Sequence, residues 1–147
     1  MTQEDKELLL KDLSSRLPYG VKVNNEIQGN FTVYGICENF IYGRSEVCHI
    51  DFAVEKIKPY LFPLSSMTDR QRIELYKALG AGYQSHYHLS KEWEDFNNSI
   101  DNNDLFLPAS WCSDLNKMYN YLNKNHFDYR ELIYIGLAID ATGLNIY

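Results

Sequence analysis

The stretch IKPYLFPLSSMTDRQRIELYKALG, residues 57–80, holds the clearest signals for where secondary structure begins and ends. Two prolines bracket a short apolar segment, and a pair of serines follows it. Thr68 and Gln71 then form a T-x-x-Q capping box, in which each side chain can bond a backbone N–H at a helix start. Apolar residues recur after the box at helical spacing until Gly80. We therefore predict a helix over residues 69–79, with a β-rich half of the chain before this stretch and a helix-rich half after it.

The N-terminal segment predicts a helix over residues 3–17, capped by Thr2. Its leucines, including Leu9 and Leu13, fall on one face, so this face should pack on the core. Residues 21–52 are rich in β-forming types and are divided by turn signals. The short connections favour antiparallel pairing, so we expect three or four antiparallel strands.

The last of these strands shows the clearest alternation. In residues 46–52, Ile50 and Phe52 are expected to face the core, which places His49 and Asp51 together on the opposite face. Residues 38–45 predict a loop or a short strand at 40–42. Residues 53–61 fit a short helix, because their apolar residues recur at helical spacing.

The second half of the chain reads mostly as helix. Residues 90–96 fit one or two helical turns, and residues 97–104 are polar and predict a loop. Residues 111–122 have the strongest helical periodicity in the chain. Asp128 and Glu131 resemble a D-x-x-E helix start, which predicts a further helix up to Gly136.

A strand over residues 137–139 is then expected to return to the sheet edge. The elements together predict an α+β fold, in which a small antiparallel sheet of three or four strands packs against three to five helices. The length of 147 residues favours a single globular domain over residues 1–147.

Composition excludes several classes of protein. The net charge of −6 argues against a sequence-independent nucleic-acid binder, which needs a basic surface. The three cysteines include no C-x-x-C pair, so we expect free thiols and a cytoplasmic location. No signal peptide and no apolar run long enough for a membrane span is present in the sequence. The 12 tyrosines suit either a core with its rim or an interface.

Two histidine-containing pairs offer the one candidate for metal chemistry. His49 and Asp51 would share a strand face, and His86 and His88 would do the same if they lie on a strand. If the pairs converged, they could bind a divalent metal, because imidazole and carboxylate are common ligands. The resulting alternative function is a small metal-dependent hydrolase.

No motif in the sequence carries a known chemistry. Glycine-rich phosphate loops, the G-x-S-x-G nucleophile motif and the H-E-x-x-H zinc motif do not occur. We therefore assign no catalytic residue and no cofactor.

Three segments together resemble a known family. They are MTQEDKELLLKDLSSRLPYGVKV at the N-terminus, IKPYLFPLSSMT at 57–68 and LNKNHFDYRELIYIGLAID at 122–140. In these segments the chain is similar to small uncharacterised proteins encoded in gut Bacteroidales genomes and in their phages or prophages. The resemblance implies a bacterial or phage cytoplasmic protein, and it brings no catalytic residues with it.

The favoured hypothesis is therefore a non-enzymatic binding or accessory protein whose partner is another protein, with neither nucleic acid nor membrane involved. Its binding surface is expected in the segment that the family resemblance leaves out, and it would comprise Tyr83, His86, Tyr87, His88 and Trp93. The sequence carries no signal for an oligomeric state.

Overall fold

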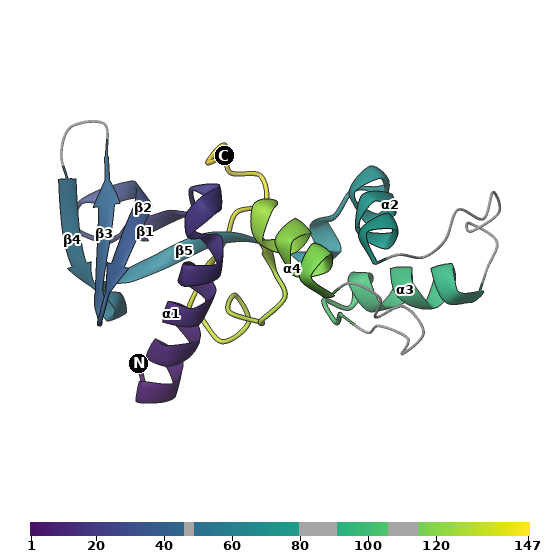
Figure 1. Cartoon of the computed structure of the whole chain (residues 1–147), viewed down its shortest axis with the longest axis horizontal. Coiled ribbons are helices and arrows are strands. Elements are labelled where there is room, and N and C mark those ends of the chain that lie inside the picture. The colour runs from purple at the N-terminus through teal and green to yellow at the C-terminus, as the bar shows by residue number, and fades with distance from the viewer. Residues whose placement is uncertain (46–48, 80–90, 106–114) are drawn as a thin grey trace. The chain divides into compact units, whose positions relative to one another are not determined.

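The computed structural model describes residues 1–45, 49–79, 91–105 and 115–147 (Figure 1). These residues form four α-helices and seven β-strands, which confirms the α+β class. The chain divides into two compact units. We call residues 1–62 with 130–147 the sheet unit, and residues 63–129 the helical unit. The boundary between the sheet unit and the helical unit falls inside the 57–80 stretch. The expectation that both units form a single domain stays a prediction.

The sheet unit begins with helix α1, Gln3–Arg16, as predicted. Thr2 caps it in a full capping box, in which the Asp5 N–H donates to Thr2 Oγ1 over 3.1 Å and the Thr2 N–H donates to the Asp5 carboxylate over 2.7 Å. The bond from the Thr2 backbone is the main reason why the pKa of Asp5 is lowered. Leu9 and Leu13 are fully buried, which confirms that this face packs on the core.

Six strands belong to the sheet unit, more than the predicted three or four. They are β1 (Lys22–Asn25), β2 (Gly29–Cys37), β3 (Phe40–Arg44), β4 (His49–Ala53), β5 (Ile57–Pro63) and β7 (Ile139–Asp140). The first five pair antiparallel in the order β4-β3-β2-β1-β5, and β7 pairs parallel with β5. The prediction fell short because residues 40–44 form a complete strand and because β5 was expected to be helical.

The predicted helix over residues 53–61 is wrong. A single 3₁₀ turn, η2 (Val54–Lys56), is followed directly by β5. Pro59 explains the difference, because proline has no N–H for a helix interior, whereas it is tolerated in an extended strand. Ile57 and Leu61 are both buried within β5, so their spacing reflects burial in the sheet rather than one face of a helix.

The predicted helix after Asp128 is also wrong. Asp128 lies in the two-residue strand β6 (Phe127–Asp128), which belongs to the helical unit, and residues 132–136 form turns. Glu131 has a φ of 59°, and a left-handed residue interrupts a right-handed helix. The strand expected at 137–139 is present as β7, two residues later than its predicted start.

The core of the sheet unit lies between the sheet and α1. The inner face of the sheet contributes Phe31 and its neighbours, and the Phe31 ring lies 5.5 Å from the Phe52 ring. The buried core comprises Leu9, Leu13, Val21, Val23, Phe31, Val33, Ile41, Ile50, Val54, Ile57, Leu61, Leu132, Leu137 and Ala138. Residues from 130–147 are therefore part of the same core as the N-terminal 62 residues.

A charged cluster is buried beside this core. Asp12 and Arg16 have fully buried side chains and form a two-pronged ion pair, with N–O distances of 2.7 and 2.9 Å. Arg130, at the start of the returning segment, places its Nε 3.3 Å from the second oxygen of Asp12. One carboxylate thus holds a guanidinium group from α1 and another from a segment more than a hundred residues away.

The final residues of the chain also dock on the sheet unit. Tyr147 accepts a hydrogen bond from the Lys22 N–H over 3.2 Å and donates one to the Tyr60 carbonyl over 2.8 Å. Burial of this hydroxyl raises the pKa of Tyr147 to about 12.

The helical unit contains η3 (Leu64–Ser66), α2 (Asp69–Ala78), α3 (Lys91–Asp101), α4 (Leu115–Lys124) and β6. The predicted capping box is confirmed, since the Gln71 N–H donates to Thr68 Oγ1 and the Thr68 N–H donates to Gln71 Oε1. Within the predicted 111–122 helix, the described part forms α4 from Leu115 onward.

The polar segment 97–104 was expected to be a loop, but its first five residues continue α3. The reason is the buried Arg72 of α2. Its guanidinium group donates to Asp101 over 2.6 Å, to Asn97 over 3.3 Å and to the Met67 carbonyl over 3.2 Å. Two of the polar residues that suggest a loop, Asn97 and Asp101, are therefore partners of one arginine.

Replacement of Gly43 is expected to destabilise the sheet unit. A Cβ atom on Gly43 would lie only 1.9 Å from the Phe31 ring, so Gly43→Ala must displace a core aromatic side chain, at about 1–3 kcal/mol. Gly35→Ala is the matched control on the neighbouring strand, because its Cβ would meet Tyr42 at an ordinary 3.6 Å. Chemical denaturation should show a lower midpoint for the Gly43 variant, and equal loss in both variants would contradict this packing.

Removal of the Asp12 carboxylate should destabilise the sheet unit more than Gly43→Ala does. Asp12→Ala leaves the fully buried Arg16 without its paired charge, which costs about 3–5 kcal/mol in comparable buried pairs. Glu55→Gln removes the half-exposed pair with Lys6 and serves as the control, for which no measurable change is expected. A similar unfolding midpoint for both variants would show that the buried cluster does not hold the unit together.

The docked Tyr147 predicts a pH dependence at alkaline pH. Its hydroxyl ionises near the usual 10.0 in the unfolded chain and near 12 in the folded one, so its stabilising effect is complete below pH 10 and is lost between pH 10 and 12. The difference in unfolding free energy between wild type and Tyr147→Phe should therefore shrink over this interval. Tyr134→Phe, at an 88% exposed position, should show no such change. If the difference in unfolding free energy between wild type and Tyr147→Phe stayed constant from pH 10 to pH 12, the raised pKa of Tyr147 would be refuted.

Candidate functional site

The face of the sheet opposite the core is the surface on which a site can be built. Strand alternation places Thr32 and Tyr34 of β2 on this outer face, together with alternate residues of β3 and β4. The strand register aligns Thr32 with Arg44, Arg44 with His49, and Tyr42 with Asp51. These residues therefore form adjacent rows across three strands.

An irregularity in β2 sets the position of Tyr34. The register between β2 and β3 shifts between Val33 and Gly35, so Tyr34 is the additional residue of a β-bulge. Val33 still faces the core, and Tyr34 projects from the opposite face with 55% of its surface exposed. Bulges redirect side chains in this way and are common beside functional sites.

Three aromatic side chains are exposed on this face. They are Tyr34 at 55%, Phe40 at 47% and Tyr42 at 36%. Large apolar side chains gathered on one exposed face indicate a surface that contacts another molecule. We call the face formed by Thr32, Tyr34, Phe40, Tyr42, Arg44, His49 and Asp51 the outer face.

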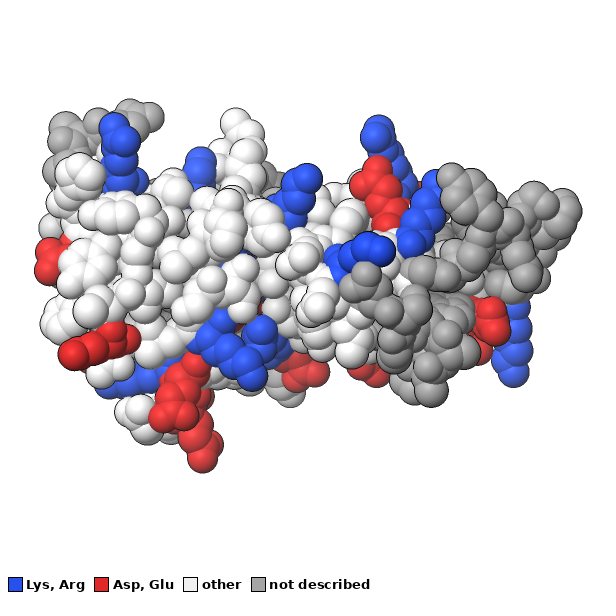
Figure 2. Space-filling view, viewed as in Figure 1, with Lys and Arg blue, Asp and Glu red and all other residues white. Residues whose placement is uncertain are grey.

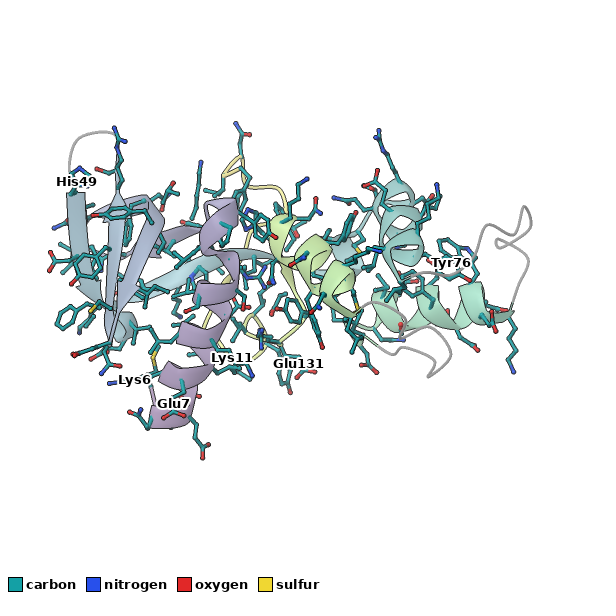
Figure 3. All side chains as sticks on the ribbon, viewed as in Figure 1. Lys6, Glu7, Lys11, His49, Tyr76 and Glu131 are labelled. Atoms are coloured by element: carbon teal, nitrogen blue, oxygen red, sulfur yellow. The ribbon has the colours of Figure 1, made fainter. Side chains whose placement is uncertain are left out.

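A shallow hollow lies at one end of the outer face. It is lined by Thr32, Tyr34, Arg44, Ser45 and His49. The Tyr34 ring meets the His49 ring edge-on at 5.7 Å, and His49 lies at the start of β4 (Figure 3). Arg44 forms no ion pair with any residue that the structure describes. The hollow thus combines an aromatic wall with a cation that is available to a partner's acidic group.

The structure places one of the two histidine-containing pairs of the metal hypothesis. His49 and Asp51 share the exposed face, which confirms their predicted placement. His86 and His88 lie outside the described residues. No group of three or more metal-binding side chains occurs within residues 1–45, 49–79, 91–105 and 115–147.

The binding surface predicted from the sequence lies largely outside the described part of the chain. Tyr83, His86, Tyr87 and His88 all fall there. Trp93 is half-buried in the helical unit, and its ring lies 5.0 Å from Tyr76 of α2 and 5.7 Å from Phe96 of α3. Trp93 therefore packs with the aromatic residues of its own unit, and the predicted surface as a whole stays a prediction.

Sequence reasoning missed the outer face because residues 38–45 were interpreted chiefly as a loop. The signal was present in the alternation of Phe40, Tyr42 and Arg44, which requires that all three lie on one strand. The bulge at Tyr34 breaks the alternation of β2, so the second row of the face was hidden as well.

The surface charge is unevenly distributed in the view of Figure 2. Few charged side chains cover the strands of the sheet unit, whereas acidic and basic side chains gather over α1.

None of the helices formed by the described residues has the length and apolar character needed to cross a bilayer.

Comparison with protein families finds a match over most of the chain. The family model described as base plate wedge protein 53 matches residues 15–146, which include parts of both units. No curated protein and no solved structure matches the chain.

Proposed function

Because the chain belongs to the base plate wedge protein 53 family, we propose that it is a non-enzymatic structural subunit of a phage baseplate and assembles there with other baseplate proteins. The observation that carries this proposal is the family match over residues 15–146. The phage-related part of the resemblance noted in the sequence agrees with this family, and the Bacteroidales origin stays a prediction.

The outer face is the proposed contact with a neighbouring baseplate protein. Exposed tyrosines are among the residues that contribute most to protein interfaces, because they bury a large ring at little entropic cost. Tyr34 and Tyr42 project from a hydrogen-bonded sheet, so the surface is already in place before the partner arrives. Binding then requires little rearrangement of this unit.

Arg44 and His49 would set the specificity of this contact. A partner that places a carboxylate in the hollow would form a charge-assisted hydrogen bond with Arg44 and exclude competitors that lack an acid. The partner is a protein, in line with the sequence-based expectation. Neither nucleic acid nor a membrane takes part, and assembly takes place in the cytoplasm of the host.

The proposal can be tested in a phage that lacks the gene and is complemented from a plasmid. Tyr34→Ser combined with Tyr42→Ser should lower the yield of infectious particles and weaken co-purification with the other baseplate proteins. Loss of one such contact residue typically costs about 2 kcal/mol, or roughly 30-fold in affinity.

Leu144→Ser is the matched control, since Leu144 is an apolar residue of the sheet unit with 46% exposure. It should complement like the wild type, and thermal unfolding of all variants should be similar. A double variant that folds, co-purifies and complements normally would rule out the outer face as the contact. Absence of the wild-type chain from assembled baseplates would rule out the structural role itself.

A further inference from the structure

A second surface of the sheet unit presents apolar side chains in an unusual way. Tyr134 is 88% exposed and the adjacent Ile135 is 45% exposed. Both lie in the turn of residues 131–136, which precedes β7. Single exposed apolar residues are common, but here two neighbours project from one short loop.

The loop is held rigidly by its own backbone. The Ile135 N–H donates to the Glu131 carbonyl over 3.1 Å, and the Gly136 N–H donates to the Ile133 carbonyl over 3.1 Å. The Leu132 carbonyl accepts from both Leu137 and Ala138, over 2.8 and 3.0 Å. These bonds hold the backbone of the loop in one conformation.

Both ends of the loop are fixed to buried groups. Leu132 and Leu137 belong to the core cluster, with 0% and 7% exposure. On the N-terminal side, Arg130 contacts the buried Asp12. The loop therefore cannot fold its apolar tip back onto the unit without losing these contacts, so Tyr134 and Ile135 stay exposed.

The loop also contains backbone strain. Glu131 has a φ of 59°, in the left-handed region that a residue with a side chain rarely adopts. Strain of this kind persists where the surrounding structure imposes it, and it concentrates at sites of function. Strain and exposed apolar surface in one loop both oppose stability of the isolated chain, so a partner that covers the tip would offset them.

Charge adds a further constraint on the partner. Glu131 is the one charged residue between positions 131 and 138, and it is exposed (Figure 3). No ion pair joins it to a described residue, whereas its neighbour Arg130 is engaged with Asp12. The loop itself is thus apolar at its tip and acidic at its start, and a complementary partner surface combines an apolar pocket with a basic rim.

We propose that the 131–136 loop is a second docking surface, which inserts Tyr134 into an apolar pocket of a neighbouring baseplate protein and pairs Glu131 with a lysine or arginine at the rim of that pocket. This inference rests on the proposed function. The loop joins the core formed by α1 and the inner side of the sheet, so it does not use the outer face. One subunit would then contact the assembly through two surfaces.

Site-specific photo-cross-linking tests this directly. Tyr134 is replaced by p-benzoylphenylalanine in the plasmid copy of the gene, and phage assembly is irradiated. The matched control carries the same replacement at Ile27, which is 87% exposed in the β1–β2 turn. We expect one adduct from position 134 to a different baseplate protein, at apolar residues next to a lysine or arginine, and none from position 27.

Three outcomes would overturn the inference while the proposed function stands. The first is assembled baseplates that contain the chain but yield no adduct from position 134. The second is an adduct to a second copy of this chain, and the third is equal adducts from positions 134 and 27. Baseplates that lack the chain altogether would instead refute the proposed function.

Variants of Glu131 separate binding from a structural role. Glu131→Gly relieves the left-handed strain and removes the charge, so its unfolding temperature should equal or exceed that of the wild type while affinity for the cross-linked protein falls about tenfold. Glu131→Lys should weaken binding further, because it opposes a basic rim with a like charge. Unchanged affinity in both variants would refute the basic rim.

Discussion

The structure of the sheet unit depends on the two guanidinium groups that Asp12 holds. Arg16 belongs to the same helix as Asp12, whereas Arg130 follows the whole helical unit in the sequence. Burial of charge contributes little net stability by itself, yet a buried carboxylate accepts few alternative partners. The cluster therefore specifies where the returning segment must dock, and with it the positions of Leu132, Leu137 and β7.

One face of the sheet packs the core and the other exposes aromatic side chains, and two features of β2 and β3 account for this difference. Gly43 leaves room for the Phe31 ring on the inner side, while the bulge between Val33 and Gly35 turns Tyr34 outward. A well-packed inner face makes the sheet a stiff support, and stiffness is what allows exposed aromatic residues to bind without a large entropic cost. Packing and recognition are thus linked through β2 and β3.

Short sequence patterns correctly predicted the features that depend on residues close together in the chain. The capping box at Thr68 and the leucine face of α1 were visible in the sequence and are present in the structure. Pro59 is itself a local signal against the predicted helix over residues 53–61, whereas the helical state of Asn97 depends on the distant Arg72. The alternation of Phe40, Tyr42 and Arg44 indicates one row of the outer face, but strand pairing and the bulge in β2 decide which residues lie beside that row.

The topology of the chain affects the order in which the sheet unit can fold. Strands β5 and β7 are direct neighbours, with Tyr60 beside Ile139 and Leu61 beside Asp140, yet the whole of the helical unit separates them in sequence. The helical unit is therefore an insertion between two adjacent strands. During synthesis the sheet unit gains the core contacts of residues 130–147 only after the helical unit has been made, so its folding depends in part on distant contacts.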